Sequence, residues 1–153
     1  MNNQLTTAVH ILAVLAHREG KGSVTSEEIA EGFGTNPVVI RRVMSLLKKA
    51  ELVKSRPGTG GGSVLGRPAE EITLRDAYTA VTIETGSVLG RQSGNCRSNI
   101  PIAPIIAEYL NELYEDAEKA LIRRLGSVTI SDFRLEIANR AKASLSKVSG
   151  NNP

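Results

Sequence analysis

Positively charged side chains gather in one part of this 153-residue chain, between Pro37 and Arg67. That stretch holds seven Lys or Arg residues and one Glu, a net charge of +6, in a chain whose formal net charge is +3. The remainder of the chain therefore sums to −3. Cations concentrated on one surface attract polyanions such as the phosphate backbone of a nucleic acid. The charge distribution thus predicts a nucleic-acid contact in this stretch.

The spacing of the residues from Asn36 onward predicts a helix that displays these cations. Asn36 can cap the first turn, and Pro37 fits the first helical position because its missing N–H would have no helical partner there. Apolar residues recur at i, i+3 and i+7 and share one face, formed by Ile40, Val43 and Leu47. The basic residues fall largely on the other faces: Arg41, Arg42, Lys48 and Lys49.

Two short extended runs follow, LVKSR and SVLGR, joined by the glycine-rich tip PGTGGG. A helix followed by a hairpin with a glycine tip is the outline of a winged helix-turn-helix. In such a domain the helix enters the major groove of DNA, and the wing reaches the backbone or the minor groove. A phosphate-binding loop is the rival interpretation of the tip, but the spacing GxxxxGK[ST] and a strand–loop–helix order are both absent. Nucleotide binding is therefore not expected.

The residues before the basic helix complete a helix-turn-helix. In TSEEIAEGFG, Thr25 or Ser26 caps a short helix whose residues Ile29, Ala30 and Phe33 face inward, and a glycine turn follows. A plain αα-hairpin with no nucleic-acid role is the alternative, which the adjacent wing and the charge excess disfavour. The expected fold is mainly α with a small β-wing: a winged helix-turn-helix domain plus a long dimerisation helix.

The residues expected to contact DNA come from these elements. Val38 and Val39 are not needed for the buried face and could contact thymine methyl groups. Arg42 is placed to reach a base or a phosphate, whereas Arg41 can serve the backbone. The wing glycines allow a close approach of the two backbones. The full set is Thr25, Ser26, Asn36, Pro37, Val38, Val39, Arg41, Arg42, Lys48, Lys49, Ser55, Arg56, Thr59, Gly60 and Gly61.

Other chemistries find little support. No Ser/His/Asp or Cys/His grouping has a defensible sequence context, and no loop carries a carboxylate pair suited to acid–base catalysis, so an enzyme is not expected. His10 and His17 lie seven residues apart on the predicted first helix and lack the closer spacing and further ligands of a metal site. Aromatic residues make up 3% of the chain, which disfavours stacking of single-stranded bases and favours duplex DNA.

Cys96 is the single cysteine of the chain, so no internal disulfide can form and a reducing compartment is expected. It lies in the Gly-, Ser- and Asn-rich segment 84–100, with Arg91 and Arg97 nearby in sequence. Positive neighbours favour the reactive thiolate, so Cys96 is a candidate sensor of oxidants or electrophiles; a bystander thiol is the alternative.

With no secretion signal and no apolar stretch of about 20 residues, a cytoplasmic protein without a membrane span is expected.

The longest helical pattern runs from Pro101 to about Leu125. Its apolar residues step by four and three, the spacing of a coiled-coil seam. The expected dimerisation residues are Ile106, Leu110, Leu113, Ala117 and Leu121. A lone amphipathic helix has little of its own chain to cover it, so pairing with a second copy is expected, and packing on its own domain is the alternative.

The last helix has Phe133, Ile137, Ala141 and Leu145 on one face. The expected division is residues 1–82 for DNA binding with a linker helix, and 83–153 for the loop, the dimerisation helix and the C-terminal helix.

The run NPVVIRRVMSLLKKAELVKSRPGTGGGSVL, with ITLRDAYTAV after it, resembles the Rrf-two family of bacterial transcription regulators. It resembles the YwnA-like branch of that family, which has a similar TNPVVxRR helix and one cysteine before the long helix. The resemblance covers nearly the whole chain and is strongest from Thr35 to Val81. It implies a homodimer that binds palindromic promoter DNA, usually as a repressor. It also implies Pro37–Ala50 as the recognition helix and Gly58–Gly62 as the wing tip.

Cluster-binding members of that family carry three cysteines before the dimerisation helix, where this chain has only Cys96. Because an iron–sulfur cluster usually takes four thiolate ligands and a dimer supplies two, no cluster, metal or other cofactor is expected. The leading hypothesis is a homodimeric, sequence-specific repressor. Its signal would be a thiol modification at Cys96, a small ligand in the interface, or a partner protein. The alternative is a protein-interaction module or small-ligand sensor built on the winged-helix scaffold.

Overall fold

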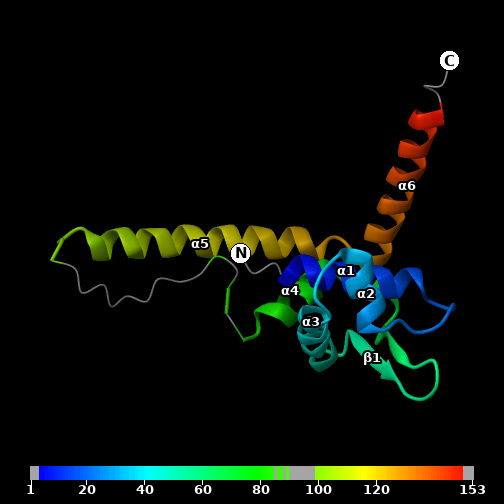
Figure 1. The fold of residues 1–153 in the computed structure, drawn as a ribbon. Helices are drawn as coiled ribbons and strands as arrows, with labels where there is room; N and C mark the ends of the chain where they lie inside the picture. The colour runs from blue at the N-terminus through cyan, green and yellow to red at the C-terminus, as the bar shows by residue number, and fades with distance from the viewer. Residues whose placement is uncertain (1–3, 85, 88, 90–98, 150–153) are drawn as a thin grey trace.

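The computed structural model describes residues 4–84, 86, 87, 89 and 99–149. Within these residues the chain forms six α-helices, one 3₁₀ turn and a two-stranded antiparallel sheet (Figure 1). In chain order the elements are α1 (Gln4–His17), α2 (Ser26–Phe33), α3 (Pro37–Lys49), β1 (Val53–Arg56), β2 (Gly62–Leu65), η1 (Ala69–Glu71), α4 (Leu74–Thr82), α5 (Ala103–Gly126) and α6 (Ile130–Ser149). The predicted fold class, mainly α with a small β-wing, is confirmed.

Three helices begin with the same reciprocal capping arrangement. In each, a Thr hydroxyl accepts a hydrogen bond from the backbone N–H three residues on, and the acidic side chain there accepts one from the Thr backbone N–H. The pairs are Thr25 with Glu28 before α2, Thr73 with Asp76 before α4, and Thr129 with Asp132 at α6. The backbone hydrogen bonds hold the pKa of Glu28 and of Asp132 below their ordinary values, because they favour the charged carboxylate.

Helices α1 to α4 enclose one hydrophobic core. The apolar face predicted for α3 lies in it, with Ile40, Val43 and Leu47 buried. The prediction that Phe33 faces inward is wrong. Its side chain is 38% exposed, and its ring stacks on that of His10 with the centroids 4.5 Å apart. Phe33 is the last residue of α2, so its ring packs at the edge of the core, beside α1.

Strands β1 and β2 form the wing, which is attached to the segment before α2. The strand register pairs Val53 with Leu65, Lys54 with Val64, Ser55 with Ser63, and Arg56 with Gly62. The backbones of Val24 and Ser63 form an antiparallel bridge, and the Ser23 hydroxyl donates a hydrogen bond to the Gly60 carbonyl at 2.7 Å. Gly62 permits this close approach, because a Cβ there would lie 2.7 Å from the Val24 carbonyl oxygen.

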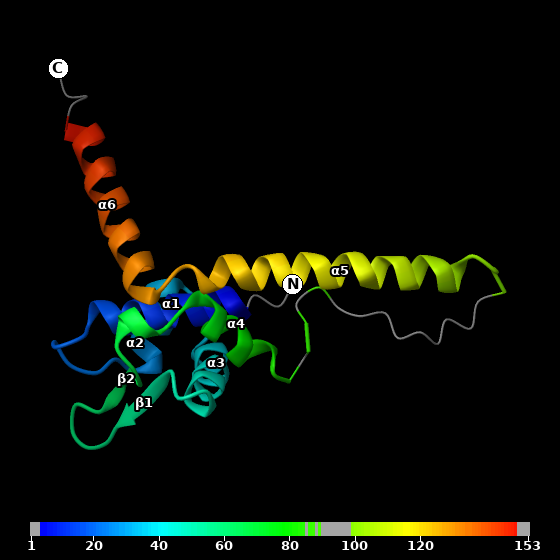
Figure 2. The same cartoon turned by 180° about the vertical axis from the view of Figure 1, so that it is seen from behind.

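Helix α5 extends from this body as an arm, and α6 leaves the body in another direction (Figures 1 and 2). The C-terminal end of α5 lies at the body, and its N-terminal end lies far from it. Within α5, all of which is described, only Ala107 is buried. Helix α6 packs against α1 near its start, where Ile130 is fully buried and its N–H donates to the Ile72 carbonyl at 2.7 Å. The two helices therefore leave long exposed faces.

Candidate nucleic-acid interface

The outward side of α3 carries a stripe of side chains at the spacing i, i+4, i+7 and i+11, which lies on one face of a helix. The stripe consists of Val38, Arg42, Ser45 and Lys49, all exposed. At its start, the Asn36 side-chain oxygen accepts a hydrogen bond from the Val38 N–H at 2.9 Å, and Pro37 occupies the first turn, as predicted. The cap and the buried face together hold this stripe toward solvent.

Two valines at the first turn of α3 face solvent, although the helix has a complete buried face without them. Val38 and Val39 are exposed large hydrophobic side chains. Branched aliphatic side chains at the leading end of such a helix are suited to contact with thymine methyl groups in a major groove. The helix N-terminus beside them carries a partial positive charge that favours nearby phosphates.

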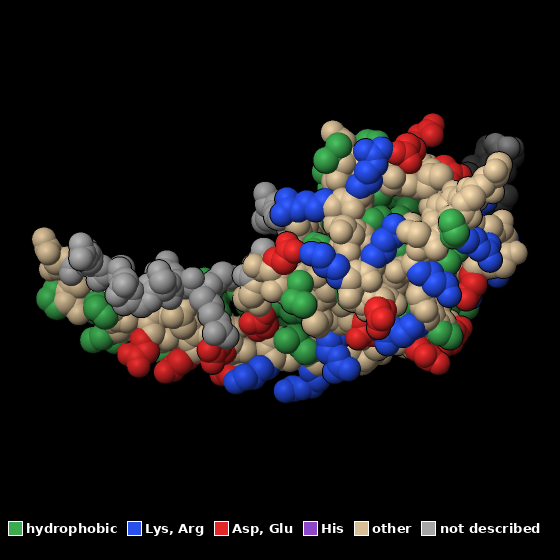
Figure 3. Space-filling model, turned by 90° about the horizontal axis from the view of Figure 1, so that it is seen from below, with side chains coloured by type: hydrophobic (Ala, Val, Ile, Leu, Met, Phe, Trp, Pro, Cys, Tyr) green, Lys and Arg blue, Asp and Glu red, His purple; other side chains and the backbone are tan. Residues whose placement is uncertain are grey.

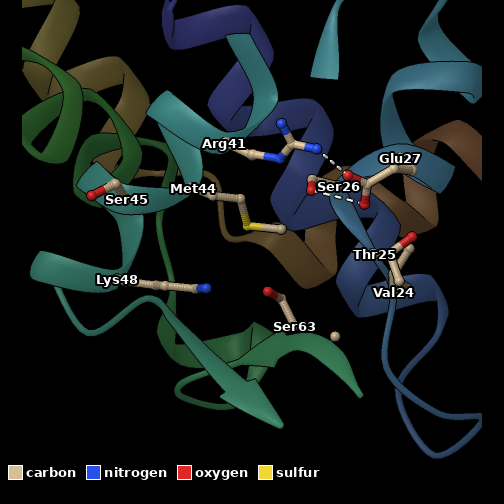
Figure 4. A pocket seen from close by; sticks show the side chains of 10 residues that line it. Val24, Thr25, Ser26, Glu27, Arg41, Met44, Ser45, Lys48 and Ser63 are labelled. Carbon is tan, nitrogen blue, oxygen red and sulfur yellow. Dashed lines mark hydrogen bonds and ion pairs between the residues drawn. The ribbon is translucent and has the colours of Figure 1, made fainter. Parts of the chain in front are cut away.

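A solvent-open hollow of about 430 Å³ lies between α2, α3 and the wing (Figure 4). We refer to it as the α2–α3–wing hollow. The charged and hydroxyl side chains that carry its chemistry are Ser26, Glu27, Arg41, Ser45, Lys48 and Ser63. Arg41, Ser45 and Lys48 stand at i, i+4 and i+7 on α3, so one side of that helix forms a wall of the hollow. Two of the wall's three side chains are cations.

On one side of the hollow, the Arg41 guanidinium donates a hydrogen bond to the Glu27 carboxylate and forms an ion pair with it (Figure 4). The Ser26 hydroxyl donates to the same carboxylate at 3.1 Å. The hydrogen bond from Arg41, followed by those from the backbone N–H of Glu27 and from Ser26, holds the pKa of Glu27 below its ordinary value. Glu27 is therefore a carboxylate at neutral pH.

On the other side of the hollow, Lys48 and Ser63 point toward one another (Figure 4). Ser63 is 6% exposed, and its hydroxyl has no hydrogen-bond partner among the described residues. Because the hydroxyl opens to the hollow, a water molecule or a ligand oxygen can reach it.

The wing adds exposed polar groups next to this surface. Ser55 and Arg56 are exposed on β1, and Thr59 and Gly60 are exposed at the tip. Figure 3 shows Lys and Arg side chains gathered over the body of the molecule, with Asp and Glu side chains among them. Asp and Glu side chains also line the α5 arm in that view. The body, and not the arm, is thus the part of this face suited to a polyanion.

The structure brings some of the predicted contact residues together and gives others different roles. Ser26, Arg41 and Lys48 line the same hollow. Thr25 also lines the hollow, but its hydroxyl accepts the hydrogen bond from the Glu28 N–H that caps α2. The Lys49 ammonium, at the end of α3, forms an exposed ion pair at 3.3 Å with the Glu84 carboxylate, which lies just after α4.

Sequence reasoning did not identify Glu27, Ser45 and Ser63 as residues of this surface. Ser45 could have been found, because it stands one turn after Arg41 on the same side of α3. Glu27 and Ser63 could not, since their positions depend on how α2 and the wing pack against α3.

The predicted dimerisation residues lie on α5, away from this surface, and the predicted sensor is not among the described residues. Cys96 lies outside the described residues. The predicted dimerisation residues are exposed or half-buried in the single chain: Ile106, Leu110, Leu113, Ala117 and Leu121. Among the described residues, no group of three or more His, Cys, Asp or Glu side chains is placed to hold a metal ion. None of the described helices combines the length and apolarity needed to cross a bilayer.

Solved structures share this architecture. The crystal structure of a transcriptional regulator from Lactobacillus plantarum matches with a TM-score of 0.70 at 26% sequence identity. The match covers 99% of this chain and 100% of that one. The helical arm and the wing thus belong to a known arrangement.

Sequence comparison assigns the family. The pattern of the Rrf2 family, described as iron-dependent transcriptional regulators, matches residues 1–134. YwnA of Bacillus subtilis strain 168, named as an HTH-type transcriptional regulator, is 35% identical over 132 residues, covering 86% of this chain and 95% of YwnA. The HTH-type transcriptional regulator IscR of Sodalis glossinidius is 32% identical over 115 residues, covering 69% of this chain and 70% of IscR. The chain belongs to the Rrf2 (Rrf-two) family, a family of transcriptional regulators and not of enzymes.

Proposed function

We propose that the protein is a homodimeric repressor that binds a palindromic site in double-stranded promoter DNA. The observation that carries this proposal is the outward stripe of α3, flanked by Arg41 and Lys48 on one side and followed by an exposed wing. In this arrangement α3 enters the major groove, and the wing lies against the backbone or the adjacent minor groove. Occupation of a promoter site would then exclude the transcription machinery.

The proposal divides the contact residues by chemistry. Asn36, Val38, Val39 and Arg42, at the leading end of α3, face base edges, and Arg42 can donate two hydrogen bonds to a guanine. Arg41 and Lys48 face phosphates, as do the polar and glycine residues of the wing: Ser55, Arg56, Thr59, Gly60 and Gly61. Phosphate contacts fix the register of the protein on the duplex, and base contacts select the sequence.

A second copy of the chain is the proposed partner of the α5 arm. Ile105, Ile106, Tyr109 and Leu113 are exposed on α5, the helix that extends from the body as an arm. Contiguous exposed apolar side chains on a helix mark an interaction surface, and a two-fold axis is the commonest way to cover one. Two recognition helices related by that axis would read half-sites about 34–36 Å apart, which is one turn of DNA.

An iron–sulfur cluster does not fit the cysteine count of this chain, although the family description names iron. The chain has one cysteine, so two copies supply two thiolates where an iron–sulfur cluster usually takes four. The described residues add no cluster of His, Cys, Asp or Glu around a metal position. We propose that the signal is a thiol modification at Cys96. Because no iron–sulfur cluster is expected, protein purified without oxygen should be colourless. A visible charge-transfer absorption band would show that a cluster is bound.

The test of DNA binding begins with selection of bound fragments from a genomic library by the purified protein. Binding to the selected duplex is then measured by fluorescence anisotropy. We expect Arg42→Ala and Arg56→Ala to weaken binding, the first by about 1–3 kcal/mol if Arg42 reads a base. Lys142→Ala is the matched control, because Lys142 is an exposed cation on α6. If all three variants bind like the wild type, the proposed DNA-facing surface is wrong.

Repression needs a separate measurement. A reporter gene placed behind the selected site should be expressed less when the protein is present and should recover with Arg42→Ala. Higher expression in the presence of the wild type would instead identify an activator.

A further inference from the structure

The carboxylate of Glu27 occupies a position built for an anion. It lies at the start of α2, where the first backbone N–H groups of a helix have no helical partner. It accepts hydrogen bonds from the Ser26 hydroxyl at 3.1 Å and from the Arg41 guanidinium. Its own backbone N–H is a further donor, and these donors together keep Glu27 ionised. The chain therefore fills this anion position with one of its own side chains.

The same donors are those that bind a phosphate group. Helix N-termini, guanidinium groups and hydroxyl groups are recurrent phosphate ligands, and a guanidinium can bind two phosphate oxygens at once. The adjoining hollow adds the Lys48 ammonium and the Ser63 hydroxyl (Figure 4). The Ser63 hydroxyl faces the solvent-open hollow and makes no hydrogen bond to the described residues, so it is available to a phosphate oxygen.

The location of the hollow brings it to the DNA backbone. It lies between α3 and β2, the two elements that the proposed function places in the major groove and against the neighbouring backbone. The phosphate backbone that separates the two DNA grooves must pass through the space between α3 and the wing. This inference rests on the proposed function, because that proposal places α3 and the wing on the DNA.

We propose that the α2–α3–wing hollow binds a phosphate of the DNA backbone, and that Glu27 holds this position in the free protein until the phosphate displaces it. On binding, Arg41 exchanges the Glu27 carboxylate for the phosphate, and Lys48 and Ser63 provide the further contacts. The exchange needs only side-chain rotation, since the side chains of Arg41 and Glu27 are 57% and 59% exposed. Exposed ion pairs of this kind contribute little stability and separate readily.

The exchange has a functional consequence. Because the displaced carboxylate remains near the phosphate, Glu27 weakens binding to every DNA sequence by a similar factor. Binding at a promoter then depends more strongly on the base contacts of Val38, Val39 and Arg42. Glu27 would thus limit the time that the protein spends on non-specific DNA.

Glu27→Gln tests the proposal, with Glu31→Gln as the matched control. Both residues are exposed glutamates of α2, so the change in total charge is the same. At about 0.1 M salt we expect Glu27→Gln to bind the selected duplex and a random duplex about fivefold more tightly than Glu31→Gln does, the effect of one like-charge contact in water. The slope of log affinity against log salt should become steeper by up to about 0.9. In the wild type, the displaced Glu27 carboxylate takes up a cation and so offsets one counterion released from the DNA, whereas a glutamine takes up none.

A double-mutant cycle tests whether Arg41 mediates the effect. In an Arg41→Ala background, the gain from Glu27→Gln should shrink, since the phosphate has lost the donor for which Glu27 competes. Equal affinities of Glu27→Gln and Glu31→Gln would overturn the inference. Weaker binding by Glu27→Gln would overturn it as well and would make Glu27 a positioning residue for Arg41.

The outcomes separate this inference from the proposed function. If the wild type binds no DNA, the proposed function fails. If the wild type binds DNA through Arg42 but Glu27→Gln matches Glu31→Gln, only the phosphate exchange fails. Ser63→Ala gives an independent measurement: it should weaken binding to both duplexes, and unchanged affinity would remove Ser63 from the phosphate position.

Discussion

Val24 and Ser63 exchange two backbone hydrogen bonds, from the Val24 N–H to the Ser63 carbonyl at 3.0 Å and from the Ser63 N–H to the Val24 carbonyl at 2.8 Å. This pair joins the segment before α2 to the second strand of the wing. The wing is therefore held against the helix-turn-helix, and its separation from α3 is set before any ligand binds. Gly62 lies beside the pair, and its lack of a side chain is what lets the two backbones approach.

Gly62→Ala should loosen the wing. The added Cβ would lie 2.7 Å from the Val24 carbonyl oxygen, so the backbone must shift. We expect the free energy of unfolding, measured with urea, to fall by about 1–3 kcal/mol, as in overpacked sites. DNA affinity should fall with it, because the wing would no longer be fixed relative to α3.

Gly32→Ala is the control for that variant. A Cβ at Gly32 meets no atom within 4 Å, and the residue lies inside α2. The free energy of unfolding should rise by about 0.5–1 kcal/mol through helix propensity. If the two alanine variants have the same stability and affinity, the contact between the wing and Val24 does not hold the wing in place.

Ile106→Glu should separate the proposed dimer. Ile106 is 56% exposed in the single chain, and a two-fold interface would bring the two new carboxylates close together in an apolar environment. Sedimentation equilibrium should show a monomer, and affinity for a palindromic duplex should fall because only one half-site is held. Ile83→Glu makes the same change at a side chain that is 74% exposed on the body, outside the α5 arm. A dimer that survives Ile106→Glu as well as Ile83→Glu would place the interface elsewhere.

Much of the fold could be predicted because its signals are local. The start and the buried face of α3 follow from Asn36, Pro37 and the spacing of Ile40, Val43 and Leu47. A cap and the first helical turns involve residues close in sequence, so their interaction does not depend on the rest of the molecule. The Thr129 cap of α6 is equally local, because it joins Thr129 to Asp132 three residues on.

The features that could not be predicted join distant residues. The ion pair of Glu27 with Arg41 requires the packing angle between α2 and α3, which no pattern of spacing contains. The last helix shows a related limit. Its predicted apolar face includes Ile137 and Leu145, both exposed, whereas Ile130 at its start is fully buried. Periodicity indicates that a helix has an apolar face, but it does not indicate what covers that face.

Asp132→Ala should make stability less dependent on pH. The pKa of Asp132 is lowered in the folded protein by its hydrogen bonds with Thr129, so the cap stabilises the fold above the ordinary Asp pKa and is lost as pH falls through the lowered value. The urea midpoint at neutral pH should be lower for Asp132→Ala than for the wild type. The difference should narrow as pH falls below about 4, because the carboxyl of the unfolded chain is then protonated while that of the folded protein is still charged.

Asp116→Ala is the control for Asp132→Ala. Asp116 is an exposed carboxylate on α5 that pairs with Lys119 at 3.5 Å and caps no helix. Its removal should change the midpoint little at either pH. A difference between wild type and Asp132→Ala that stays constant from neutral to acid pH would show that the charge of Asp132 does not support the cap.

Cys96→Ser should remove any response of DNA binding to oxidants. Hydrogen peroxide converts a reactive thiolate to a sulfenic acid, which can condense with a second thiol to a disulfide, and a thiol reductant reverses both products. If Cys96 is the sensor, peroxide should weaken operator binding by the wild type, dithiothreitol should restore it, and Cys96→Ser should bind equally before and after treatment. Because Cys96 is the only cysteine, a disulfide could form only between two copies, and it would appear as a covalent dimer in a non-reducing gel. Identical peroxide titration curves for wild type and Cys96→Ser would exclude the thiol and leave a small ligand or a partner protein as the signal.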